Sequence, residues 1–156
     1  MITTSRIARP SEPGAETIKD VCLDVYTDES NRLAELLPTL RARPNVLIDG
    51  PARDTERMFD RLRPYLRAPL ATWAPRETRW VPTGTFRTLV IRDADSLNAT
   101  QQESVARFIS RTAGRVQVVS IAGTPLFPLV TRGVFLERLY YQLNTILFEH
   151  TPAARR

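Results

Sequence analysis

The sequence predicts an α/β protein: a parallel, three-layer sheet of the P-loop type with helices on both faces. Three observations lead to this fold class. Short apolar segments alternate with segments of helical periodicity along most of the chain. Residues 88–91, Thr-Leu-Val-Ile, are apolar almost throughout, which is typical of a central parallel strand. Asn98 can cap a helix that runs to Thr112 and ends before Gly114.

The first 66 residues are expected to contain two strands, each followed by a helix. Residues 18–26 place apolar side chains on alternate positions and predict a short strand. A helix capped by Asp28 or Ser30 follows, in which Pro38 implies a kink or an early end. Residues 45–49 predict a buried strand that ends at Gly50. The next helix is expected over 54–66, with an apolar stripe of Met58, Phe59, Leu62, Tyr65 and Leu66.

The second half continues the alternation. Residues 69–73 predict a strand, and the turn-forming residues of 74–87 predict a loop. After the helix that ends at Thr112, residues 115–121 predict another strand. A helical stretch over 126–141, interrupted by Pro128 and Gly133, then leads to a last strand over 145–148.

Composition indicates one domain and excludes several kinds of site. Of the 156 residues, 1–17 are expected to form a flexible arm, 18–150 the core and 151–156 a tail. No run of 18 apolar residues is present and the N-terminus lacks a signal-peptide core, so a cytoplasmic protein without a membrane partner is expected. Cys22 and His150 are the only residues of their types, which argues against a disulfide, a cysteine-cluster or histidine-rich metal site, and a histidine-based triad.

The basic character of the chain leaves nucleic acid open as a partner. The net charge is +5, and almost all of the basic residues are arginine. Basic proteins gain affinity for nucleic acid by releasing counterions from phosphates. The arginines are scattered, however, and a solvated arginine-rich surface accounts for them equally simply. Trp73 and Trp80, beside Arg76 and Arg79, are expected either to form a contact surface or to pack in the interior.

A candidate phosphate site lies between the strand ending at Asp49 and the helix that follows it. A P-loop requires a glycine-rich turn, a lysine and a hydroxyl residue at the start of a helix. Counted from Gly50, the position before the lysine holds Thr55, the lysine position holds Glu56 and the hydroxyl position holds Arg57. A carboxylate repels phosphate where an ammonium would attract it, although Arg53 or Arg57 can supply a replacement charge.

The second candidate site follows the central strand and reads Arg92-Asp93-Ala94-Asp95. Hydrolysis of a nucleotide needs one carboxylate near Mg²⁺ and another near the attacking water. Asp93 and Asp95 can form such a pair. The alternative is that they cap or solvate the loop before Asn98.

Several segments together resemble the AAA+ domain of sigma-54-dependent transcription activators. Residues 46–50 resemble the family's "VLITG", 88–97 its "TLFLDEIGEL" and 116–123 its "VRVIAATN". The segment from Arg132 to Asn144 resembles "GRFREDLYYRLN", and Gln102 also matches. The resemblance covers roughly residues 30–148 and implies the AAA+ fold, with Phe135, Leu139, Tyr140 and Leu143 as packing residues.

The departures from this family fall on its chemical residues. The resemblance assigns the P-loop lysine to Glu56, the first Walker B acid to Arg92, the sensor asparagine to Gly123 and the two arginine fingers to Leu136 and Gln142. The stretch from Gly50 to Thr88 is too short for the family's GAFTGA insertion, which contacts the sigma factor. The chain ends soon after the last strand, so the helical lid is expected to be missing.

Three functions follow from this pattern. The first is a non-hydrolysing, degenerate AAA+ core, a pseudo-ATPase without a cofactor or catalytic residues, which acts in bacterial regulation through an AAA+ protein or a transcription component. The second is a regulator that binds or weakly hydrolyses ATP with Mg²⁺, using Arg53 or Arg57 in place of lysine and Asp93 for the metal. The third is a small basic DNA-binding protein.

Overall fold

The structure is a computed structural model that describes residues 31–79 and 81–150. It divides into two compact units with the boundary between Pro38 and Thr39. The described part of the first unit is helical, within a helix over 31–40 that continues past Pro38. The early end expected at Pro38 is therefore wrong. The strand expected over 18–26, the arm over 1–17 and the tail over 151–156 lie outside the described residues.

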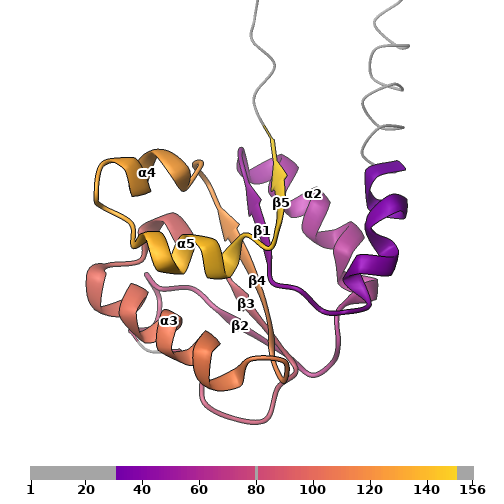
Figure 1. Ribbon diagram of the computed structural model, residues 1–156, viewed down its shortest axis with the longest axis horizontal. Helices are drawn as coiled ribbons and strands as arrows, with labels where there is room; N and C mark the ends of the chain where they lie inside the picture. The colour runs from indigo at the N-terminus through magenta and orange to yellow at the C-terminus, as the bar shows by residue number, and fades with distance from the viewer. Residues whose placement is uncertain (1–30, 80, 151–156) are drawn as a thin grey trace, which may run out of the picture. The chain divides into compact units, whose positions relative to one another are not determined.

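The described residues of the second unit form an all-parallel five-stranded sheet in the order β2-β3-β4-β1-β5 (Figure 1). The chain alternates between strands and helices, as the sequence predicts. The strands are β1 (Val46–Asp49), β2 (Leu70–Trp73), β3 (Thr88–Ile91), β4 (Gln117–Ala122) and β5 (Ile146–Glu149). The α-helices are α2 (Ala52–Leu62), α3 (Ala99–Thr112), α4 (Phe127–Thr131) and α5 (Glu137–Leu143), with 3-10 turns η1 (Arg63–Tyr65) and η2 (Ala94–Ser96).

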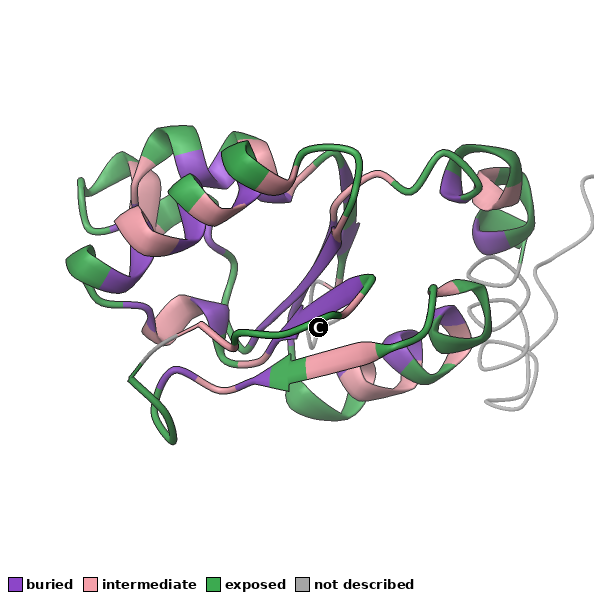
Figure 2. Ribbon diagram, turned by 90° about the horizontal axis from the view of Figure 1, so that it is seen from below, coloured by how far each residue is buried: buried purple, intermediate pink, exposed green. Residues whose placement is uncertain are grey.

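Helices cover both faces of this sheet, which gives the predicted three layers. On one face, α3 and α5 pack on each other and on the sheet, and Leu47, Leu89 and Val118 join Val105 and Leu139 in one core cluster. On the other face α2 packs against β1 and β4 through Met58, Phe59 and Leu62. Figure 2 shows the buried strands between the exposed outer sides of the helices. Burying apolar area on both faces supplies most of the stabilising free energy.

The helix α3 illustrates how local sequence sets a boundary. The Asn98 side chain accepts a hydrogen bond from the Gln101 N–H at 2.9 Å, and the Gln101 side chain accepts one from the Asn98 N–H at 3.0 Å. This reciprocal arrangement satisfies two N–H groups that the first helical turn would otherwise leave unbonded. The N-cap predicted at Asn98 and the helix end at Thr112 are therefore confirmed.

Several boundaries differ from those that the sequence predicts. The helix α2 begins at Ala52 rather than Asp54 and gives way to a 3-10 turn at Arg63, so Tyr65 is half-exposed instead of part of an apolar stripe. The strand predicted over 115–121 is β4, displaced toward Ala122. The helical stretch over 126–141 is two helices, α4 and α5, and the interruption predicted at Gly133 is confirmed. The interruption predicted at Pro128 is wrong: Pro128 is the second residue of α4, because the first turn tolerates a missing N–H.

The connection from β2 to β3 contains no helix within its described residues, 74–79 and 81–87. This agrees with the predicted loop. Trp73, at its start, is 1% exposed and donates its indole N–H to the Thr78 carbonyl at 2.9 Å. Trp73 is therefore an interior residue, whereas Trp80 lies outside the described residues. Within the described part of the chain, no helix is long and apolar enough to cross a membrane.

Candidate functional site

The site predicted between β1 and α2 is a turn of only two residues, Gly50 and Pro51. The strand ends at Asp49 and the helix begins at Ala52. The N–H groups of Asp54 and Thr55 both donate to the Pro51 carbonyl, at 2.9 and 3.0 Å, and Pro51 has no N–H. Of the backbone donors in this turn, Pro51 therefore contributes none and those of Asp54 and Thr55 are used by the first helical turn, which leaves only the N–H groups of Ala52 and Arg53.

Gly50 itself is enclosed by the end of β5. Its φ is +135°, a conformation that favours glycine. A Cβ added there would lie 2.6 Å from the His150 Cβ and 2.7 Å from the His150 carbonyl oxygen. The Gly50 N–H donates to the Ala122 carbonyl at 3.1 Å, and the His150 N–H donates to the Asp49 carbonyl at 2.9 Å. The turn after β1 is thus bonded to the ends of β4 and β5 rather than open.

Glu56 and Arg92 form an ion pair across this region. Glu56 lies on α2 and Arg92 directly follows β3, and one guanidinium nitrogen of Arg92 bonds to a carboxylate oxygen of Glu56. The guanidinium also lies 5.3 Å from the centre of the Phe59 ring, in a cation–π arrangement. The resemblance assigns the P-loop lysine to Glu56 and the first Walker B acid to Arg92. Each position therefore carries the charge opposite to that of the family residue, and the two side chains bind each other.

The remaining charged residues of the α2 turn do not gather into a phosphate site. Arg53 is exposed, and Arg57 lies 4.0 Å from Asp54 on the same helix. Thr55 is buried and its hydroxyl donates to the Ala52 carbonyl at 3.1 Å, within the helix. Asp54 and Glu56 place negative charge near the helix N-terminus, where the helix dipole favours it, and Arg57 and Arg92 lie against these carboxylates.

The two aspartates after β3, Asp93 and Asp95, lie in different surroundings. Asp93 is exposed and adopts a left-handed conformation with φ 50°. Asp95 turns toward the end of β4, where its carboxylate accepts hydrogen bonds from the Gly123 N–H at 3.3 Å and the Thr124 hydroxyl at 3.1 Å. Gly123, the sensor position, is therefore held by Asp95. No three acidic, histidine or cysteine side chains of residues 31–79 and 81–150 gather as metal ligands.

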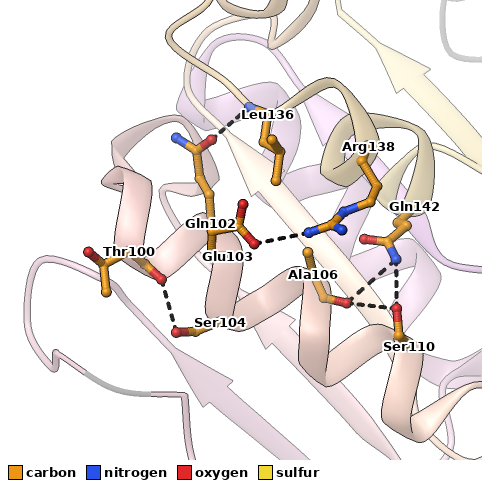
Figure 3. A network of polar contacts seen from close by, with 9 residues as sticks. All are labelled: Thr100, Gln102, Glu103, Ser104, Ala106, Ser110, Leu136, Arg138 and Gln142. Atoms are coloured by element: carbon orange, nitrogen blue, oxygen red, sulfur yellow. Dashed lines mark hydrogen bonds and ion pairs between the residues drawn. The ribbon is translucent and has the colours of Figure 1, made fainter.

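The two residues that the resemblance assigns to the arginine fingers, Leu136 and Gln142, face α3 of their own chain (Figure 3). Gln142, on α5, donates to the Ser110 hydroxyl at 3.2 Å and to the Ala106 carbonyl at 3.5 Å. Leu136 packs against the core, and its N–H donates to the Gln102 side-chain oxygen at 2.7 Å. These residues therefore tie α5 to α3. The predicted packing residues Phe135, Leu139, Tyr140 and Leu143 are all buried.

Two buried polar residues, Gln102 and Asp49, had no structural role assigned to them from the sequence. Gln102 is 4% exposed and donates to the carbonyls of Leu97 at 2.9 Å and Val134 at 3.1 Å, in addition to accepting from Leu136. Asp49 is 3% exposed, and its Oδ1 has no partner among the described residues. Burial, together with the nearby charge of Glu149, raises the pKa of Asp49 from 3.8 to about 6, against the lowering effects of the Leu126 N–H and His150. The sequence signal for Asp49 was an aspartate at the end of an apolar strand.

The sheet order, the flanking helices and the position of the turn after β1 define the class as a P-loop-type, AAA+-like α/β domain. Residues 77–152 match the family model of the sigma-54 interaction domain. The match covers β3 to β5 and leaves the turn after β1 outside the matched residues.

Solved structures share the fold at low sequence identity. NtrX from Brucella abortus in complex with ATP is 14% identical with a TM-score of 0.62, covering 78% of this chain and 35% of its own. The P-loop NTPase domain of the sigma-54 transport activator from E. coli is 17% identical with a TM-score of 0.60, covering 81% and 97%. RuvB from Thermotoga maritima is 15% identical with a TM-score of 0.50, covering 80% and 44%.

This chain thus spans about a third of the length of NtrX and nearly the whole of the E. coli domain. At these identities the likeness establishes the fold. Comparison with curated protein sequences gives no match.

Proposed function

We propose that this protein is a non-hydrolysing core of the sigma-54-activator type, which acts through protein contacts in bacterial regulation. One observation carries the proposal: α2 begins two residues after β1, and the Glu56–Arg92 ion pair stands where the family's lysine and acid would meet Mg·ATP. Neither the backbone nor the charges fit a phosphate with its metal ion. Leu136 and Gln142, which bond within the chain, offer no cation to a neighbouring subunit.

The partner in this proposal is another protein, either an AAA+ protein or a component of the sigma-54 transcription machinery. The support is the match of residues 77–152 to the sigma-54 interaction domain model, together with the packing residues of α3 and α5. Such a domain keeps the shape through which AAA+ subunits pack while contributing no hydrolysis of its own. Its regulatory effect would come from occupying a surface of the partner.

Calorimetry with Mg·ATP and Mg·ADP tests the proposal. We expect no binding heat at millimolar nucleotide and no phosphate release above a protein-free control, because the turn after β1 supplies no free cradle of N–H groups. The E. coli P-loop NTPase domain, which has the same fold and nearly the same extent, is the positive comparison. A low-micromolar dissociation constant accompanied by turnover would remove the proposal.

A weak ATP-binding regulator is the second candidate, and one observation favours it. Arg53 is exposed in the first turn of α2, and Asp93 is exposed after β3, so a cation and a carboxylate remain accessible. The same calorimetry decides between the two functions. Weak heat that disappears in Arg53→Ala, with the fold unchanged, would favour this second candidate.

A further inference from the structure

Two hollows lie beside the second half of α3, on either side of Phe86. One, of about 460 Å³, is lined by the loop 81–86 and by residues of α3 from Ser104 to Thr112. The other, of about 540 Å³, is lined by residues 84–87 and by residues around the end of α3, from Thr112 to Val116. Gly84, Phe86 and Thr112 line both, so the two hollows form one groove.

The floor of this groove is apolar. Phe86 and Phe108 stack with ring centres 6.0 Å apart and planes at 27°, and both are only partly buried. Val81 and Pro82 extend the apolar lining of the first hollow. Partly buried aromatic and aliphatic groups gain free energy when a partner side chain removes their remaining surface from water.

The rim of the groove is basic. Arg107 and Arg111 lie one turn apart on α3 at the first hollow, and Arg87 and Arg115 line the second. All four are exposed, and among the described residues none of the four forms an ion pair. Within the described part of the chain, the side-chain hydrogen bond of these arginines joins an Arg115 guanidinium nitrogen to the Arg111 carbonyl at 2.6 Å. The guanidinium groups are therefore available to carboxylates of a partner.

We propose that this groove binds an acidic peptide segment of a partner protein, with an aromatic or branched aliphatic side chain as its anchor. The anchor would fill the hollow over Phe86 and Phe108, and carboxylates on either side of it would meet the arginines. Charge complementarity of this kind selects the partner and raises the rate of association. The inference rests on the proposed function in protein contacts and names the chemistry of one partner surface.

A nucleic-acid ligand fits the groove less well. Phe86 and Phe108 stack on each other, so each ring has one face already covered and offers less surface for a base. A peptide anchor needs only an apolar hollow, which the loop 81–86 and α3 provide. Duplex DNA is nevertheless included in the test, because arginines also bind phosphates.

The test is fluorescence anisotropy with a fluorescein-labelled acidic peptide that carries one phenylalanine and one leucine. Arg107→Glu with Arg111→Glu should weaken binding at least tenfold. Arg63→Glu with Arg132→Glu changes the net charge equally at exposed positions away from the groove, and should change the affinity less than threefold. Phe86→Ala should weaken binding at least fivefold, whereas Phe127→Ala, on exposed α4, should not.

Equal weakening by the two double variants would overturn the groove proposal, as would absence of peptide binding to the unaltered protein. Duplex DNA that binds more tightly than the peptide and is lost in the Arg107 and Arg111 variant would identify a nucleic-acid site instead. Circular dichroism checks the fold of each variant, and Arg107→Gln replaces the double change if folding is lost. Calorimetry with Mg·ATP on the same preparation separates the two proposals, since nucleotide binding contradicts only the proposed function.

Discussion

Asp49 shows how one buried carboxylate makes the stability of the domain depend on pH. Asp49 is the last residue of β1, where burial and the charge of Glu149 favour the neutral form of its carboxyl group. The unfolded chain has the ordinary pKa, so between pH 4 and 6 the folded state binds more protons than the unfolded state. The contribution of Asp49 to stability is therefore fully present below about pH 4 and is lost as pH rises through about 6.

Asp49→Asn should remove this dependence. We expect the free energy of unfolding of the unaltered protein to fall between pH 4 and 7 by on the order of 2 kcal/mol more than that of the variant. At pH 7 the variant should be the more stable of the two, because an amide carries no charge into the interior. Urea unfolding at both pH values measures the difference. Parallel pH profiles for the two proteins would show that Asp49 does not titrate in this range.

Changing the ion pair between Glu56 and Arg92 tests how two side chains affect nucleotide binding while the backbone turn before α2 stays the same. Glu56→Lys combined with Arg92→Asp restores both family letters and keeps opposite charges facing each other. We expect thermal stability within about 1 kcal/mol of the original, since both side chains are more than a third exposed and screened by solvent. Each single change should be less stable than the double.

The same double variant should still give no binding heat with Mg·ATP. The two-residue turn before α2 stays unchanged, and it supplies no loop of backbone donors. Micromolar nucleotide binding by this variant would show instead that the two side chains alone had prevented it.

At the scale of elements, Gln102 joins the start of α3 to the segment that leads into α5. Its side-chain amide bonds to Leu97, Val134 and Leu136 from a buried position. An apolar replacement leaves two carbonyls and an N–H without these partners, each at a cost of about 1 kcal/mol or more.

Gln102→Leu should lower the free energy of unfolding by about 3 kcal/mol. Glu103→Gln is the matched control, one position along α3. It removes only the exposed 3.0 Å ion pair with Arg138 and should cost less than about 1 kcal/mol. Chemical denaturation of both variants makes the comparison. A loss for Gln102→Leu no larger than that of the control would contradict a structural role for the amide.

Elements with strong local signals could be predicted from the sequence, and features set by distant contacts could not. The side chains of Asn98 and Gln101 set the start of α3. The apolar run of β3 can be recognised without knowing which strands lie beside it. The start of α2 depends on Gly50 fitting against His150, a hundred positions away. The pairing of Glu56 with Arg92 likewise joins a helix to a different strand, although each departure from the family was visible singly.

At the scale of the whole chain, the AAA+-like fold is kept, and the positions that the resemblance assigns to the family's chemical residues form internal bonds. Asp95 forms a hydrogen bond with Gly123, Gln142 forms one with Ser110 on α3, and Glu56 forms an ion pair with Arg92. The fold could be predicted because packing positions repeat at regular spacing in the sequence. The basic groove beside α3 could not, because its residues come from a loop and a helix whose approach depends on the sheet.

The place of β1 in the sheet also affects how the protein is made. Val46 pairs with Val119 on one side and with Ile146 on the other. During synthesis β1 leaves the ribosome 100 residues before its partner strand β5, and its second edge stays uncovered until β5 follows. A nascent chain that stalls before Ile146 would expose an apolar strand with unpaired backbone groups, which favours aggregation. Protection by a chaperone during translation would therefore matter more for this domain than for one built from neighbouring hairpins.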